Sequence, residues 1–151
     1  MTSKALIEHM NISLADSYVV LLRTQDVHWN YLGNNFYGMH KMTMEQYEDI
    51  VEGVDEIAER IRAKGHPAPS GLAKYLELTR IKISEDSTSL NGHGMCQHLI
   101  DANQVLCKTF YETVKLAEQD GDTATADLIT ERITQHEKFV WMLTATISGA
   151  D

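Results

Sequence analysis

Two imidazoles and two carboxylates in the first half of this chain could together bind a transition metal. They are His28, His40, Asp55 and Glu59. Asp55 and Glu59 stand four residues apart, so in a helix both side chains reach a single ion from the same face. Imidazole and carboxylate ligands that leave coordination positions open suit iron, with zinc or another divalent metal as a competitor. The four residues are therefore the candidate catalytic and metal-binding set.

The spacing of these residues prevents all four from meeting within one chain. His28 closes one expected helix and His40 opens the next, so a hairpin brings the two histidines to the same end of a helix pair. Asp55 follows His40 by a stretch of helix about 22 Å long. If two chains pack antiparallel about a two-fold axis, the histidines of each meet the acids of the other. A within-chain di-iron centre would use Glu-x-x-His pairs, and no histidine here follows a Glu at that spacing.

The periodicity of the apolar residues defines the elements that must position these side chains. Long helices are expected over about 3–30, 37–64, 94–119 and 123–147, with a short helix over 70–78 in the crossover between the second and third. Polar residues 84–88 are expected to form a loop. Two helix pairs joined by a long crossover are typical of a ferritin-like four-helix bundle. We therefore predict an all-α fold, with residues 1–151 in one ferritin-like domain.

Carboxylates recur along the second expected helix in a stripe about 21 Å long. The acidic stripe comprises Glu45, Glu48, Glu52, Asp55 and Glu59. No Lys or Arg lies on the same line, so each i,i+4 pair costs a few tenths of a kcal/mol in repulsion. An ordinary solvated face is the alternative, but the lack of basic residues favours cation binding. A neighbouring stripe is expected to pack on the other helices: Met44, Tyr47, Val51, Val54, Ala58 and Ile61.

The composition argues against several classes of protein. No apolar run is long enough to span a bilayer and the N-terminal residues lack the plan of a signal peptide, so we expect a cytoplasmic protein with no membrane partner. The net charge of −9 argues against a general affinity for nucleic acid, and Lys4 is the only basic residue before Arg23. Cys96 and Cys107 fall about 16 Å apart on one expected helix, and we interpret both as buried apolar residues.

Three blocks of sequence resemble the Dps family, the mini-ferritins, over nearly the whole chain. The blocks are His28-Trp29-Asn30 with Gly33, Asn35-Phe36 and His40; residues 55–61 with Gly65; and residues 137–143. The resemblance implies a dodecameric shell built from two-fold dimers. Such a shell oxidises Fe(II), preferably with hydrogen peroxide, stores the ferric mineral and protects against oxidative damage under stress. The histidine pair would come from one subunit and the acid pair from its partner.

The resemblance also implies secondary roles for other residues. Trp29 looks like the tryptophan beside the iron, and its alternative role is a hydrophobic anchor at the helix end. Mineral nucleation would fall to the middle of the acidic stripe, at Glu45, Glu48 and Glu52. Family members commonly carry acids where this chain has Lys41 and Met44, so nucleation here is expected to be weaker or shifted.

Acids at the start of the last expected helix could line a pore. They are Asp122, Asp127 and Glu131, and family members similarly use acids in this region at a three-fold axis. The alternative is that Asp122 and Asp127 simply favour the helix N-terminus electrostatically.

Two rival functions follow from the same residues. One is a nucleoid shell that coats and protects DNA, with secondary iron chemistry; the net charge counts against it. The other is a purely structural bundle without metal chemistry. The remaining histidines are expected at the surface or satisfied in the core: His9, His66, His93, His98 and His136. Of these, His93 and His98 could bind adventitious metal.

Overall fold

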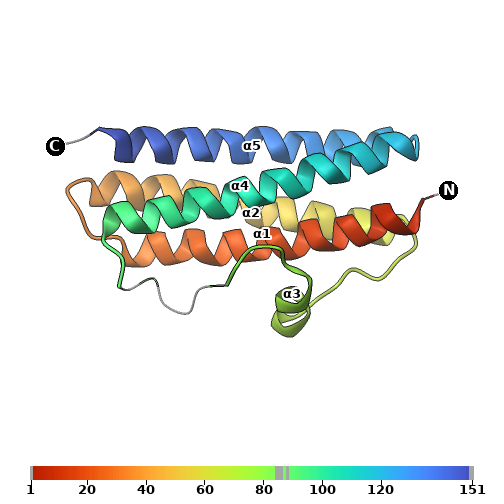
Figure 1. Cartoon of the computed structure of the whole chain (residues 1–151), viewed down its shortest axis with the longest axis horizontal. Helices are drawn as coiled ribbons and strands as arrows, with labels where there is room; N and C mark the ends of the chain where they lie inside the picture. The colour runs from red at the N-terminus through yellow and green to blue at the C-terminus, as the bar shows by residue number, and fades with distance from the viewer. Residues whose placement is uncertain (1, 84–86, 88, 150–151) are drawn as a thin grey trace.

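Five helices and their connections make up the computed structural model, which describes residues 2–83, 87 and 89–149 (Figure 1). The helices are α1 (Lys4–Asn30), α2 (Phe36–Ala63), α3 (Leu72–Leu78), α4 (Gly92–Gln119) and α5 (Thr123–Ser148). The predicted all-α plan, with a short extra helix in the crossover, is confirmed. The loop expected over residues 84–88 lies mostly outside the described residues.

Side-chain caps fix where three of the long helices begin, namely α1, α4 and α5. Ser3 accepts a hydrogen bond from the backbone N–H of Leu6 at the start of α1, and Asn91 accepts one from Gly94 at the start of α4. After α2 and α4 the chain turns at Gly65 and Gly121, whose positive φ values of 86° and 69° suit glycine. Gly121 thus forms the short α4–α5 hairpin, whereas Gly65 ends α2 where the crossover begins.

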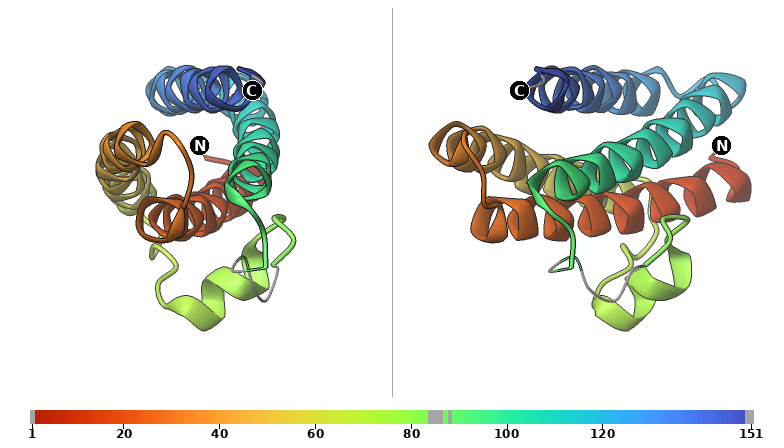
Figure 2. Two further views of the ribbon diagram at one scale, coloured as in Figure 1. Left: turned by 90° about the vertical axis from the view of Figure 1, so that its left-hand side faces the viewer. Right: turned by 60° about the vertical axis from the view of Figure 1, so that its left-hand side comes forward.

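The four long helices surround one apolar core, and α3 lies outside it against α1 (Figure 2). The α1–α2 hairpin forms the left-hand end of the bundle in Figure 1, and the α4–α5 turn forms the right-hand end. Large side chains from all four long helices are fully buried, among them Leu14, Ile57, Leu106, Phe110 and Leu143. Of the described helices, none is long and apolar enough to cross a membrane.

The inward face of α2 differs from the predicted one. Val51, expected to pack on the other helices, is 48% exposed, while its neighbour Ile50 is fully buried. The polar residues Thr43 and Gln46 and the small Gly53 share the inward face with Ile50. Apolar periodicity alone therefore placed the centre of this face about one residue away from its true position.

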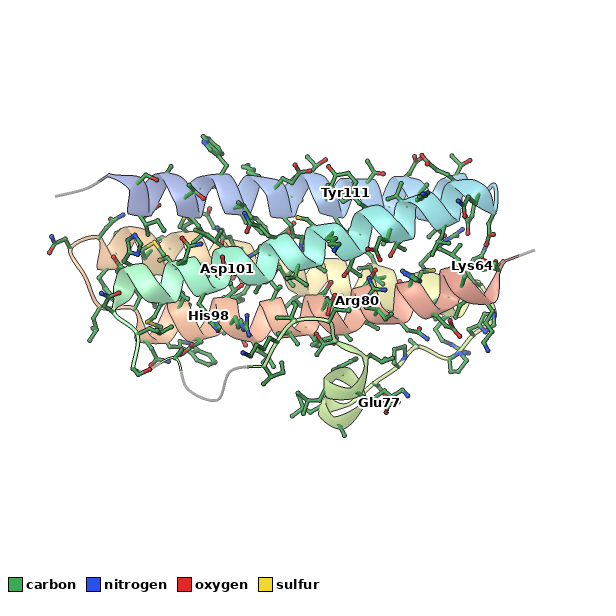
Figure 3. The ribbon with its side chains drawn as sticks, viewed as in Figure 1. Lys64, Glu77, Arg80, His98, Asp101 and Tyr111 are labelled. Atoms are coloured by element: carbon green, nitrogen blue, oxygen red, sulfur yellow. The ribbon has the colours of Figure 1, made fainter. Side chains whose placement is uncertain are left out.

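A buried aspartate ties the crossover to the bundle. The Asp16 carboxylate in α1 is fully buried and accepts hydrogen bonds from Thr79 Oγ1 (2.6 Å) and the backbone N–H of Arg80 (2.8 Å), both just after α3. It also accepts one from Thr109 Oγ1 of α4 (2.8 Å). The guanidinium of Arg80, labelled in Figure 3, pairs with Glu112 of α4. The segment of the crossover that directly follows α3 is thereby held against both α1 and α4.

A directed chain of hydrogen bonds crosses the interior between α2, α5 and α4. Arg132 Nη2 donates to Asp49 Oδ2 (2.8 Å) and to His136 Nε2 (3.2 Å). His136 Nδ1–H in turn donates to Asn103 Oδ1 (2.8 Å), because an arginine nitrogen cannot accept and so fixes the tautomer of the ring. Burial, together with the nearby Arg132 charge, holds the pKa of His136 well below its ordinary value of 6.5. His136 is therefore neutral, as expected of a satisfied core histidine.

Acidification should destabilise the fold through His136. Between its lowered folded pKa and its unfolded value of 6.5, the unfolded chain binds one more proton. The contribution of His136 to the free energy of unfolding is complete above pH 6.5 and falls by up to about 1.4 kcal/mol per pH unit below it, until the folded pKa is reached. Urea denaturation at about pH 7.5 and about pH 5.5, on wild type and His136→Gln, measures this difference. Equal pH dependence in the two proteins would contradict it.

Both cysteines are buried free thiols. Burial raises the pKa of Cys96 to about 11, and burial together with the charge of Glu137 raises the pKa of Cys107 to about 12. Neither thiol forms a thiolate readily near neutral pH, which agrees with a packing role.

Candidate metal centre

The two candidate histidines meet at the α1–α2 hairpin. His28 lies in the last turn of α1 and His40 in the first turns of α2. Their rings stack almost parallel, with centroids 3.8 Å apart and an interplanar angle of 15°. His28 is buried, with 6% of its surface exposed, and His40 is partly exposed, so the pair reaches the surface of the bundle through His40.

A reciprocal pair of hydrogen bonds fixes both ring tautomers. His28 Nδ1 lies 2.7 Å from the carbonyl oxygen of His40, and His40 Nδ1 lies 2.8 Å from the carbonyl oxygen of His28. Because a carbonyl only accepts, each Nδ1 carries the proton and each neutral ring keeps the lone pair of Nε2. Among the described residues no hydrogen bond engages either Nε2. Both rings thus present the nitrogen that a metal ion would bind, oriented by a backbone partner.

Neighbouring side chains restrain the two rings further. The ring of Phe36 stacks on His40 at 5.4 Å, and the ring of Tyr47 meets His28 edge-on at 5.1 Å. Thr43 Oγ1 lies 3.3 Å from His28 Nδ1 while donating its own proton to the carbonyl of Met39 (2.6 Å). Sequence reasoning missed these three partners. Helical spacing of Phe36, Thr43 and Tyr47 around His40 is the signal that could have found them.

The two candidate acids lie on the exposed surface of α2. Asp55 and Glu59 are exposed, and neither forms an ion pair within the described part of the chain. Over that same part, no cluster of three or more His, Cys, Asp or Glu residues could hold a metal ion. The structure brings the histidines together with one another and leaves the acids farther along α2. A centre that uses all four residues therefore needs a second chain.

Trp29 is 65% exposed beside His28 and does not anchor the end of α1 in the core of its own chain. The middle of the acidic stripe, Glu45, Glu48 and Glu52, is also exposed. Near the histidines, the ammonium of Lys41 lies 6.0 Å from the ring centroid of Tyr37, and Met44 is partly buried.

Asp122 has a structural role at the opposite end of the bundle. It caps α5 by accepting from the backbone N–H of Thr125 (3.1 Å), and it binds Arg60 (2.8 Å) and Lys64 (2.7 Å) from the end of α2. Figure 3 labels Lys64 at this end, near the α4–α5 turn. Burial alone would raise the pKa of Asp122, but hydrogen bonds from Lys64, Thr125 and Arg60 outweigh it and hold the pKa far below the ordinary value. Asp127 and Glu131 are exposed and have no ion pair among the described residues.

Comparison with known protein families and solved structures identifies the class of protein to which this fold belongs. A ferritin-like domain matches residues 7–150, which agrees with the observed four-helix bundle. The Dps protein of Vibrio cholerae O1, described as a member of a broad superfamily of ferritin-like diiron-carboxylate proteins, superposes with a TM-score of 0.88. It is 32% identical, and the match covers 97% of this chain and 91% of that one. The fold and the match define a ferritin-like protein.

Proteins of similar sequence identify the family within the ferritin-like class. The DNA protection during starvation protein of Helicobacter pylori is 32% identical over 134 residues, covering 89% of this chain and 92% of the relative. An uncharacterized low temperature-induced protein of Nostoc sp. is 31% identical over 147 residues, covering 97% and 82%. The chain belongs to the Dps family.

Proposed function

We propose that this protein is a ferroxidase and iron-storage mini-ferritin, which oxidises Fe(II), preferably with hydrogen peroxide, and stores the ferric mineral. The observation that supports this most strongly is the stacked histidine pair, because hydrogen bonds to His28 and His40 leave both Nε2 lone pairs available. Imidazoles held in this way, with Nδ1 donating to a backbone carbonyl, direct Nε2 toward an incoming Fe(II) ion. Zn(II) would compete for the same nitrogens.

In the proposed centre, His28 and His40 of one subunit face Asp55 and Glu59 of its two-fold partner. The imidazoles supply neutral donors and the carboxylates supply the negative charge that favours Fe(III) over Fe(II). Two Fe(II) ions each lose one electron, and both electrons reduce one peroxide, breaking its O–O bond to give two hydroxide equivalents. Hydrolysis of the Fe(III) product releases protons to water. Two-electron reduction avoids the free hydroxyl radical that one-electron reduction would form.

The exposed apolar side chains support contact through α1 and α2. If partner acids reach the histidines, the two-fold axis crosses α2 midway between His40 and Asp55, about 11 Å from the histidine end. Measured from the same end of the bundle, Leu22 of α1 lies at about 9 Å and Val51 of α2 at about 16 Å. The proposed two-fold axis therefore crosses the helices between these two side chains. Both are about half exposed in the single chain, at 50% and 48%. Burial against a partner would remove this apolar surface from water.

The proposed assembly is a dodecamer in the cytoplasm, built from such dimers, with the acidic stripe leading the ferric product inward. Glu45, Glu48 and Glu52 are the proposed nucleation residues, since their exposed carboxylates lack basic partners among the described residues. The positive charge of Lys41 beside His40 supports nucleation farther along α2 rather than at the centre itself.

Anaerobic loading with Fe(II), followed by separate pulses of peroxide and oxygen, tests the proposed function. Wild type should consume one peroxide for two Fe(II) and react faster with peroxide than with oxygen, and ferric mineral should co-elute with a large shell on size exclusion. Oxidation at the protein-free rate, or a monomer carrying no iron, would contradict the proposal.

Iron should reach the interior past Asp127 and Glu131. Both acids are exposed and unpaired among the described residues, whereas Asp122 is neutralised by Arg60 and Lys64. We expect Asp127→Asn with Glu131→Gln to slow mineral growth by about tenfold at low ionic strength, where steering of cations by charge is strongest. Glu118→Gln, an exposed acid at the end of α4, is the control and should change little. Equal rates in all three proteins would exclude this route.

DNA binding is proposed to be weak or absent. The Helicobacter pylori relative is named for DNA protection, but the net charge of −9 per chain here opposes contact with phosphates. A gel shift at low salt distinguishes the DNA-coating alternative, which predicts a stable complex.

A further inference from the structure

Two metal-type donors, the partly exposed Asp49 of α2 and the buried His136 of α5, converge on a single atom of Arg132. Asp49 Oδ2 of α2 and His136 Nε2 of α5 lie 2.8 and 3.2 Å from the same nitrogen, Nη2. Both accept protons from it, so their lone pairs point at one position from two different helices. Arg132 is 5% exposed and His136 is fully buried. The convergence point therefore lies within one chain, apart from the histidine pair at the hairpin.

The surroundings hold this arrangement rigidly. A Cβ on Gly53 would lie 2.5 Å from the Arg132 Cζ and 2.6 Å from its Nε, so the absence of a side chain at Gly53 makes room for the guanidinium. Asn103 orients the His136 ring through Nδ1, and the rings of Phe110 and Phe139 pack edge-on against it, with centroids 5.6 and 5.2 Å away.

A third polar group lies on the same part of α2. Gln46, one helical turn before Asp49, is 2% exposed, and its Nε2 has no hydrogen-bond partner within the described part of the chain. The Nε2 position of Gln46 therefore makes no hydrogen bond, and rotating the carboxamide by half a turn would place Oε1 where Nε2 now lies. The carboxylate of Asp49 and the imidazole of His136 are donors of the kinds that bind Fe(II), Zn(II) or Co(II).

We propose that Arg132 keeps divalent metal ions out of one position between α2 and α5, because its guanidinium is the cation bound there by Asp49 and His136. A guanidinium remains protonated at all physiological pH values, so a metal ion cannot displace its proton as it could that of a lysine. A metal ion would also need the two donors at about 2.0–2.2 Å, closer than their hydrogen-bond distances to Nη2. Arg132 thereby denies a transition metal this one position between α2 and α5. This inference goes beyond the proposed function and does not depend on the centre between subunits.

Titration with Co(II), followed by its visible absorption, tests the proposal. Arg132→Ala should bind about one Co(II) per chain more than wild type, and adding His136→Gln should abolish the extra ion. Arg132→Leu, which keeps more of the buried apolar volume, is the second variant if the alanine protein does not fold. Absence of the extra ion from either folded variant would overturn the proposal.

Co(II) binding by variants that keep Arg132 gives a second, independent test of the proposal. His136→Gln alone should leave the Co(II) stoichiometry unchanged, whereas loss of one ion per chain would show that the interior binds metal despite Arg132 and would overturn the inference. His28→Ala serves as the matched arm, since any loss of Co(II) there reports on the proposed centre between subunits. Failure of one site is therefore distinguishable from failure of the other.

Discussion

Replacing His28 and Asp55 together by alanine should lower the initial rate of Fe(II) oxidation by peroxide by at least about 100-fold, since loss of even an outer-shell partner of a metal ligand typically costs 10–100-fold. The reason is the geometry at the hairpin. His28 presents Nε2 because its Nδ1 is committed to the carbonyl of His40, and no other described histidine stacks against this pair. Stopped-flow absorbance of the ferric product measures the rate.

The control must separate lost ligands from lost structure. His66→Ala with Glu77→Ala removes an exposed histidine and an exposed acid elsewhere, and this variant should oxidise iron as wild type does. Removing the His28 ring also takes its Nδ1–H donor away from the carbonyl oxygen of His40, which we expect to cost about 1–3 kcal/mol of stability. Circular dichroism and size exclusion confirm that each shell is intact. An undiminished rate in the first variant would exclude these residues from the centre.

Asp16→Ala should lower the free energy of unfolding by about 3–5 kcal/mol, the largest stability effect that we expect of a single substitution outside the apolar core. The carboxylate is fully buried and accepts three hydrogen bonds, from Thr79, Arg80 and Thr109. Its removal leaves these donors without an acceptor and opens a cavity between α1 and α4. Urea denaturation measures the change.

Asp16→Asn is the matched control because it keeps the shape and one acceptor oxygen. It should cost less than Asp16→Ala, and backbone N–H groups around Thr79 and Ile81 should exchange faster in both variants than in wild type. A loss of less than about 1 kcal/mol in Asp16→Ala would show that the crossover is held mainly by apolar packing, such as the stacking of Tyr18 on Tyr75.

Local signals in the sequence are sufficient to predict most of the fold. Caps at Ser3, Asn91 and Asp122, and glycines at the turns, act within a few residues, so the helix ends follow from neighbouring residues alone. The inward face of α2 was predicted less well. The buried residues on this face include Gln46 and Gly53. Gly53 is buried because Arg132 of α5 packs against it, and the apolar pattern of α2 does not predict that contact.

Some features of the candidate metal centre can likewise be predicted from the sequence, whereas others depend on how the helices pack. Residue type and helical rise suffice to select His28 and His40 and to show that Asp55 lies too far away within one chain. The exchange of hydrogen bonds between the two histidines depends on the exact approach of α1 and α2 at the hairpin, which spacing does not encode. Asp122 was considered both as a pore acid and as a helix-terminal charge. The structure places it at the N-cap of α5, where it accepts from the Thr125 backbone N–H, and pairs it with Arg60 and Lys64.

Subunit complementation tests the central claim, that the metal centre is shared between two chains. One variant lacks the histidines (His28→Ala/His40→Ala) and the other lacks the acids (Asp55→Ala/Glu59→Ala); each alone should have no centre. In a mixed dimer, the histidines of the second variant face the acids of the first, which rebuilds one of the two centres. Co-assembly of equal amounts should restore about a quarter of the wild-type Co(II) binding and Fe(II) oxidation, because random pairing makes half the dimers mixed. A mixed shell with no recovered activity would contradict a shared centre.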